Sequence, residues 1–85
     1  KSAMIITSKP KEVAGAVMEE LHRGCTGMDA TGMYTGDKRT VLICAVRRHE
    51  TGTLKKLIME QDEQAFMLIS NINEVFGTNF KRLGQ

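Results

Sequence analysis

The sequence predicts an α+β domain with the ferredoxin-like order β-α-β-β-α-β, in which two helices cover one face of a four-stranded antiparallel sheet. Two observations predict this order. Four segments have the length and residue pattern of strands, and two amphipathic segments with helical spacing separate the first strand from the second and the third from the fourth. Because such crossovers are right-handed, both helices should lie on one face, with the first and third strands central and the others at the edges.

The chain is the size of one small domain, because it has 85 residues. Its hydrophobic fraction of 41% and charged fraction of 26% are those of globular proteins. The longest apolar run, Val41–Val46, is far shorter than the roughly 20 residues that span a bilayer. Two cysteines exclude a disulfide scaffold. We therefore expect a single domain over residues 1–85, with a core over about 3–72 and a C-terminal segment over 73–85.

The first strand and the first helix follow one another closely. Met4–Thr7 is a short run of apolar and β-branched residues, which favours a strand. Ser8 is the expected helix N-cap, and Pro10 suits the first helical turn. Gly24 is the expected stop of this helix. The apolar positions that recur every four residues are Val13, Val17 and Leu21.

The next segment is rich in glycine and less regular. Cys25–Gly36 holds glycines that favour a bent or bulged second strand. Thr35–Lys38 is typical of a hairpin turn. Thr40–Val46 then gives the clearest strand prediction in the chain.

The second helix is predicted from Leu54, Leu57 and Ile58, which have the spacing of one helix face. The helix should end near Asp62, and either Thr51 or His49 could be its N-cap. The fourth strand is predicted over 65–69, with an extension to residue 72 left open. Residues 73–85 show no strong period, and their basic pair is typical of a solvated tail.

The third and fourth strands carry more apolar residues than two helices can cover. A sheet with one wet face alternates apolar and polar residues, whereas both of these strands are continuously apolar. We therefore predict a homo-oligomer in which the helix-free faces pack together, through Val41, Ile43, Phe66 and Leu68. The alternative is that the C-terminal segment folds over the sheet, using the apolar residues Val75, Phe76 and Phe80.

The glycine-rich segment has part of a phosphate-binding pattern. Gly27 and Gly32 have P-loop spacing, but Met33 and Tyr34 follow where a Lys and a Ser or Thr are needed. This mismatch excludes an ordinary P-loop, while a backbone nest for an anion remains an alternative. Asp29 and Tyr34 are candidates for orienting a small ligand, although an Asp between glycines often caps its own turn.

The remaining reactive side chains form no catalytic or metal-binding pattern. His22 and Cys25 are close in sequence, but His49 and Cys44 are distant, and a structural zinc site needs four ligands. No convergent set of nucleophile, base and orienting group can be assembled, so the sequence predicts no enzyme, no cofactor and no metal. The central strands lack stacking aromatics and the net charge is only +2, which disfavours nucleic-acid binding.

Three segments together resemble a known family. Gly24–Gly36 is similar to a glycine-rich strand ending in Gly-x-Tyr-Ser/Thr-Gly, and Asp62–Phe66 is similar to Asp-x-x-Ala-Phe. Glu74–Phe80 resembles the closing pattern Glu-Val-x-Gly-x-Gly-Phe, with Asn79 in place of its second glycine. The family is the uncharacterised C-terminal domain of YitT-type bacterial membrane proteins, and the resemblance spans about residues 8–81.

This resemblance implies a ferredoxin-like domain excised from the C-terminus of a longer membrane protein, which agrees with a chain that opens without Met. It implies a place on the cytoplasmic side of the bacterial cell membrane, linked to an upstream transmembrane domain, and we expect the fragment itself to be soluble. The family is similar in topology to the PII signalling proteins, which are trimers that bind nucleotides at subunit clefts. The implied partners are copies of this chain, as in a trimer, and a small anion or nucleotide.

Two functions follow as hypotheses. The first is a regulatory or small-ligand-sensing domain that acts as an oligomer. The alternative is a purely structural oligomerisation module that binds no small molecule. The residues expected to bind a ligand are Asp29, Gly32, Tyr34, Thr35 and Gly36, with Glu74 and Gly77 from the closing pattern.

Overall fold

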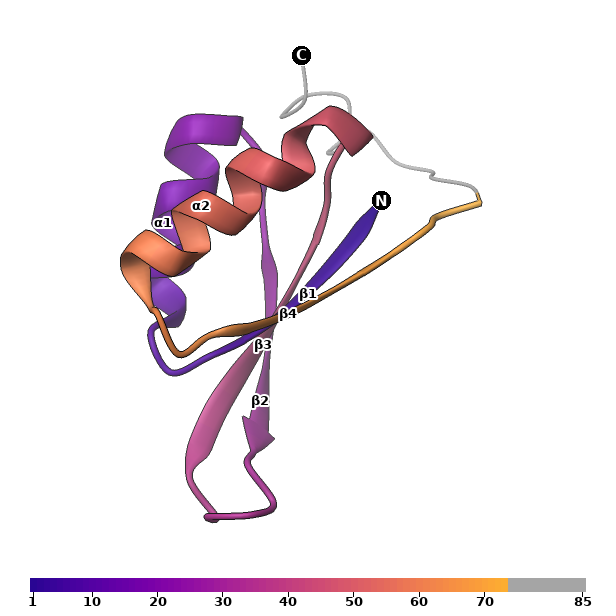
Figure 1. The fold of residues 1–85 in the computed structure, drawn as a ribbon. Helices are drawn as coiled ribbons and strands as arrows, with labels where there is room; N and C mark the ends of the chain where they lie inside the picture. Colours follow the sequence, from indigo (N-terminus) through magenta and orange to yellow (C-terminus); the bar gives the residue numbers. More distant parts are fainter. Residues whose placement is uncertain (74–85) are drawn as a thin grey trace.

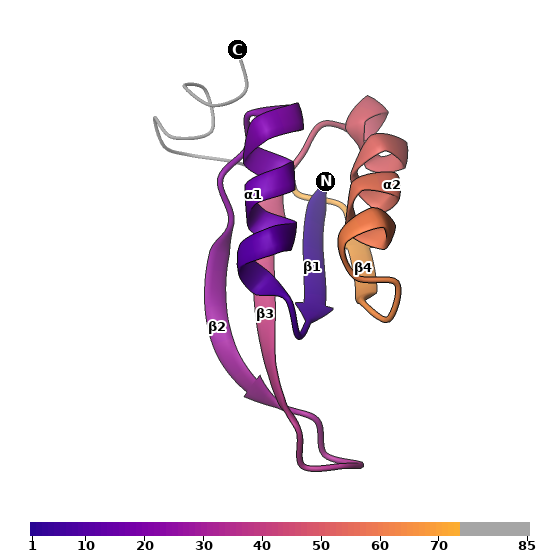
Figure 2. The same cartoon turned by 90° about the vertical axis from the view of Figure 1, so that its left-hand side faces the viewer.

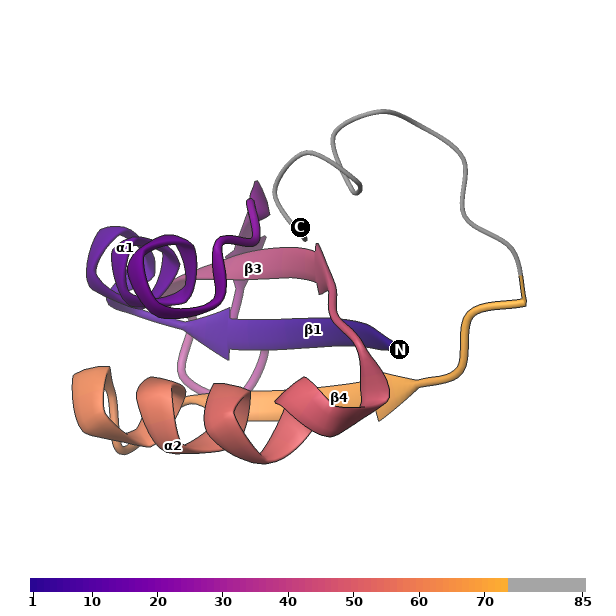
Figure 3. The same cartoon turned by 90° about the horizontal axis from the view of Figure 1, so that it is seen from above.

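The computed structural model has the predicted ferredoxin-like fold and describes residues 1–73 (Figure 1). The elements, in chain order, are β1 (Ser2–Thr7), α1 (Pro10–Leu21), β2 (Thr26–Thr31), β3 (Lys38–Ala45), the short 3₁₀ helix η1 (Arg48–Glu50), α2 (Thr51–Gln61) and β4 (Phe66–Ser70). Both helices lie on the same side of the sheet (Figures 1 and 3).

The strand order in the sheet is β2-β3-β1-β4, and every neighbouring pair is antiparallel. The prediction that the first and third strands are central is therefore confirmed. Ile5 in β1 lies opposite Leu42 in β3 on one side and opposite Met67 in β4 on the other. The β2–β3 hairpin extends beyond the ends of both helices (Figure 2).

The core lies between the helices and the sheet. Alternate residues of β1 and β3 point toward the helices, as the two-residue period of a strand requires. Each helix buries residues spaced by four, which is one helical turn. The buried apolar residues are Ala3, Ile5, Val13, Val17, Leu42, Cys44, Val46, Leu54 and Ile58. The apolar spacing seen in the sequence thus selects the helix faces that pack on the sheet.

The predicted helix caps were wrong, whereas the helices themselves were confirmed. α1 has Lys9 as its N-cap residue and no side-chain cap, so Ser8 does not play this role. The C-cap residue of α1 is His22, whose φ of 56° is left-handed, so the helix stops before it reaches Gly24. α2 follows η1 directly and has Glu50 in the N-cap position, so neither Thr51 nor His49 caps it. Its last residue is Gln61 and its C-cap is Asp62, which agrees with the predicted end near Asp62.

The hairpin is more regular than the sequence predicted. β2 is curved (Figure 2) and pairs residue for residue with β3, from Thr26 opposite Ile43 to Thr31 opposite Lys38, so it contains no bulge. The turn starts at Gly32, whose carbonyl accepts a 2.7 Å hydrogen bond from the Gly36 amide. β3 therefore begins at Lys38, two residues before the predicted start, and β4 stops at Ser70 without the extension.

Candidate functional site

The helix-free side of the sheet is apolar across all four strands. The strand register puts Ile6 between Val41 and Phe66, and Met4 between Ile43 and Leu68. Met28 of β2 lies opposite Val41 and continues the row to the other edge. We call this surface the apolar face; its members are Met4, Ile6, Met28, Val41, Ile43, Phe66 and Leu68.

All four residues predicted to form an oligomer interface belong to the apolar face. Phe66 and Leu68 in the edge strand β4 are the most open, with 57% and 50% of their surface exposed. Val41 and Ile43 in the central strand β3 are half-buried by their neighbours. Large apolar side chains gathered on one exposed sheet face mark an interaction surface, because leaving them in water is unfavourable. The residues proposed to cover this face from the C-terminal segment, Val75, Phe76 and Phe80, lie outside the described residues.

A cavity of about 500 Å³ lies between the start of α1 and the parts of β2 and β3 that are next to the hairpin turn. Its lining combines cations and hydroxyl groups from three parts of the chain. The lining residues are Ser8, Pro10, Asp29, Ala30, Thr31, Lys38, Arg39 and Thr40. Arg39 also forms an exposed ion pair of 3.6 Å with Asp37.

The predicted ligand residues are only partly brought together. Asp29 lines the cavity, opposite Thr40 in the β2–β3 register. Gly32 and Gly36 close the hairpin turn by backbone hydrogen bonds, and Tyr34 at its tip is fully exposed. Thr35 is also exposed there, and its hydroxyl accepts a 3.4 Å hydrogen bond from the Asp37 amide.

Two further predicted residues, Glu74 and Gly77, lie outside the described residues. The two cations of the cavity, Lys38 and Arg39, are not among the ligand residues that the sequence predicts. Their position at the start of the strand paired with the glycine-rich segment was the available signal.

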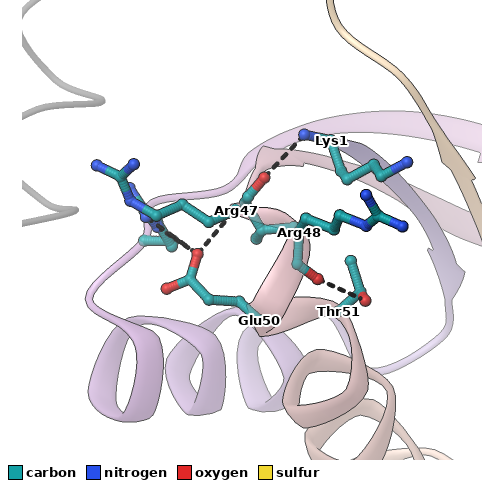
Figure 4. A network of polar contacts seen from close by, with 7 residues as sticks. Lys1, Arg47, Arg48, Glu50 and Thr51 are labelled. Atoms are coloured by element: carbon teal, nitrogen blue, oxygen red, sulfur yellow. Dashed lines mark hydrogen bonds and ion pairs between the residues drawn. The ribbon is translucent and has the colours of Figure 1, made fainter.

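A polar network joins the ends of β3 and α1 (Figure 4). Glu50 Oε1 accepts a 2.7 Å hydrogen bond from the Arg47 amide and forms a 3.0 Å ion pair with Arg23 Nη2. Arg23 is buried, with 2% of its side chain exposed, and Glu50 is 13% exposed. Burial raises the pKa of Glu50, but the hydrogen bonds from the Arg47 amide and Arg23 outweigh it, so the pKa is lowered. This network holds the connection between sheet and helices.

Residues 1–73 contain no group of three or more His, Cys, Asp or Glu side chains that could hold a metal ion. Within the same range, none of the helices combines the length and apolar character that crossing a membrane requires.

A family model described as "Uncharacterized protein conserved in bacteria (DUF2179)" matches residues 23–77. The chain belongs to the DUF2179 family. Its relatives include the membrane protein YvjA of Bacillus subtilis (strain 168), a UPF0750 protein that is 40% identical over 82 residues. That match covers 96% of this DUF2179 chain and 29% of YvjA. The UPF0750 membrane protein YitT of the same strain is 33% identical over 76 residues, which are 89% of the chain and 27% of YitT.

The resemblance to YitT-type proteins is thus confirmed, and the chain spans less than a third of the UPF0750 membrane proteins it matches. A solved DUF2179 structure from Eubacterium ventriosum is similar with a TM-score of 0.67 and 30% identity, over 81% of this chain and 94% of that one. A functionally unknown protein from Pediococcus pentosaceus ATCC 25745 has a TM-score of 0.77 at 8% identity, over 91% and 94% of the two chains. That second likeness shows the fold alone.

Proposed function

We propose that this DUF2179 domain is a non-enzymatic regulatory domain of a UPF0750-type membrane protein and that it acts by self-association through the apolar face. The main support for self-association is the apolar face, which spans four strands on the side of the sheet opposite both helices. We place the domain on the cytoplasmic side of the membrane, joined to the transmembrane part of its parent.

The position of Phe66 and Leu68 favours contact with another copy of the chain. Both lie in the edge strand β4, so an approaching copy reaches their side chains and the open backbone edge of the strand together. A second copy brings the same side chains, and a two-fold or cyclic arrangement buries both sets at once. Covering exposed apolar surface is worth about 25 cal/mol per Å², which supplies the driving force for assembly.

Analytical ultracentrifugation of the whole chain tests this proposal. We expect the wild-type protein to sediment as an oligomer at micromolar concentration and Leu68→Asp to sediment as a folded monomer. Met18→Asp is the matched control, because Met18 has a similar exposed fraction of 44% but lies on α1. A monomeric wild-type protein would overturn self-association. In that case, deletion of residues 74–85 shows whether this segment covers the face.

A second candidate function, small-anion sensing, is favoured by the cavity beside α1. Lys38 and Arg39 bring two cations to a space that also has the hydroxyl groups of Ser8, Thr31 and Thr40, and these two cations outnumber the single carboxylate of the lining, that of Asp29. Cations and hydroxyl donors together suit a phosphate group, whose oxygens accept charge-assisted hydrogen bonds. The supported ligand class is therefore a small anion or the phosphates of a nucleotide.

Thermal unfolding with inorganic phosphate and with nucleotides tests the anion proposal. A ligand that binds only the folded state raises the melting temperature. The rise grows with the logarithm of the ratio of ligand concentration to Kd. We expect Lys38→Gln to abolish the shift and Lys56→Gln, an exposed lysine of α2, to retain it. If no anion shifts the melting temperature while Leu68→Asp still dissociates the oligomer, the domain is a purely structural oligomerisation module.

A further inference from the structure

The two cysteines lie opposite each other where β2 begins and β3 ends. The strand pairing ends with Thr26 opposite Ile43; continuing this register by one residue puts Cys25 opposite Cys44, and a side-chain hydrogen bond joins the two cysteines. Directly opposite residues of antiparallel strands have Cα atoms about 4.5–5.5 Å apart. A disulfide requires a Cα separation of about 4.4–6.8 Å, which includes the separation that this register implies for Cys25 and Cys44.

The two side chains also share a face of the sheet. Cys44 belongs to the core between sheet and helices, and Cys25 packs against that core from the side. Both are free cysteines. A disulfide between them would link the start of β2 to the end of β3. Neither strand has to move, because both side chains already lie on the same face of the sheet.

The thiols differ in reactivity. A hydrogen bond with Cys44 lowers the pKa of Cys25, although partial burial opposes this effect. The same hydrogen bond, together with burial, raises the pKa of Cys44. A thiolate is the form of cysteine that reacts with oxidants. Cys25 is also the less buried of the two, so an oxidant in solution reaches it first.

We propose that Cys25 and Cys44 form a reversible intrachain disulfide, with Cys25 the first site of oxidation by a peroxide and Cys44 the resolving cysteine. This redox site is separate from the apolar face and from the anion cavity. It would covalently join the edge strand β2 to the central strand β3 under oxidising conditions.

The chemistry balances in two steps. The Cys25 thiolate attacks one oxygen of hydrogen peroxide, the O–O bond breaks, and the departing hydroxide takes up a proton to leave as water. The Cys25 sulfur is now a sulfenic acid and has been oxidised by two electrons. The Cys44 sulfur then attacks the Cys25 sulfur, the S–O bond breaks, and the hydroxide leaves as water with the Cys44 thiol proton. The net reaction converts the dithiol and one peroxide into a disulfide and two waters.

Mass spectrometry of the whole chain tests the bridge. The reduced protein is treated with hydrogen peroxide in its folded state, the peroxide is removed, and remaining thiols are labelled with maleimide in denaturant. We expect a chain that has lost two hydrogen atoms, carries no maleimide and is restored by dithiothreitol. Two maleimide labels after oxidation, or bridges only between separate chains, would overturn the proposal.

Two variants separate the roles of the cysteines. In Cys44→Ser, the sulfenic acid of Cys25 has no resolving thiol, so dimedone should trap it. In Cys25→Ser, the buried Cys44 should remain reduced under the same treatment. Equal oxidation of both variants would contradict the assignment of Cys25 as the first site. Circular dichroism of each variant checks that it is folded. The experiment on the wild-type chain tests the disulfide even if neither variant folds.

Discussion

The Thr7 hydroxyl donates a 2.5 Å hydrogen bond to Asp62 Oδ2, which joins the end of β1 to the residue that ends α2. Both residues are buried. The other carboxylate oxygen of Asp62 accepts a 3.1 Å hydrogen bond from the Gln64 amide. The bond from Thr7 is the main reason why the pKa of Asp62 is lowered, against the opposing effect of burial.

This hydrogen bond should make the domain sensitive to acid. A carboxyl with a lowered pKa stabilises the fold fully above its unfolded pKa, about 3.9 for Asp, and this stabilisation is lost as pH falls through the lower folded pKa. Thr7→Val should therefore reduce the free energy of unfolding by about 2 kcal/mol at neutral pH and by less in acid. Urea unfolding at several pH values measures this difference. Glu63→Gln, on the exposed side of the same turn, is the control.

The buried Arg23–Glu50 pair should be important for stability. Arg23 donates hydrogen bonds to Glu50 Oε1 from both Nε and Nη2, at 3.2 and 3.0 Å. Removing one partner of a buried pair costs about 3–5 kcal/mol, so Arg23→Met should lower the free energy of unfolding by that amount. Arg39→Met, which breaks the exposed pair with Asp37, should cost below about 1 kcal/mol. Similar losses in the two variants would contradict this prediction.

The end of α1 offers a stabilising substitution. His22 has a φ of 56°, and a side chain other than glycine in this left-handed region is strained by about 1–2 kcal/mol. His22→Gly should therefore raise the melting temperature. Gly36 in the hairpin turn has a φ of 78°, so Gly36→Ala should lower it. The prediction fails if both substitutions shift the melting temperature in the same direction.

Gly15 in the middle of α1 should be replaceable with benefit. A Cβ added there would meet no atom within 4 Å, and the residue is exposed. Alanine favours a helix interior over glycine by about 1 kcal/mol, so Gly15→Ala should increase the free energy of unfolding by that order. Gly52→Ala, in the first turn of α2, has equally open space and should have a smaller effect. Thermal unfolding of the two single variants measures both.

The arrangement of the elements could be predicted from the sequence, whereas their ends could not. The four-residue spacing of Val13 and Val17 indicates both a helix and the face that it buries. The right-handedness of the crossovers then determines the strand order of the sheet. Helix ends depend on distant partners. The Thr7 hydroxyl, which accepts a hydrogen bond from the Lys9 amide, is itself held by Asp62, fifty-five residues away. Local preference at Ser8 carries no information about that contact.

The candidate sites divide in the same way. The apolar face could be predicted in part, because strand period puts Val41 with Ile43 on one side of β3 and Phe66 with Leu68 on one side of β4. That the two sides coincide follows from the register of both strands with β1. The cavity could not, since it depends on how the start of α1 faces Lys38 and Arg39 across the sheet. The Cys25–Cys44 pair needed the register of the hairpin, and a turn starting three residues earlier than predicted changes that register.

The central position of β1 has a consequence for how the chain is made. Synthesis runs from the N-terminus, so β1 is released before both of its neighbours. Its first partner is β3, which begins at Lys38, and its second is β4, which is complete only at Ser70. Until β3 is made, the apolar Met4, Ile5 and Ile6 lack both neighbouring strands, and until β4 is complete they still lack one. A nascent chain of this kind is exposed to premature aggregation and benefits from chaperones that bind short apolar segments.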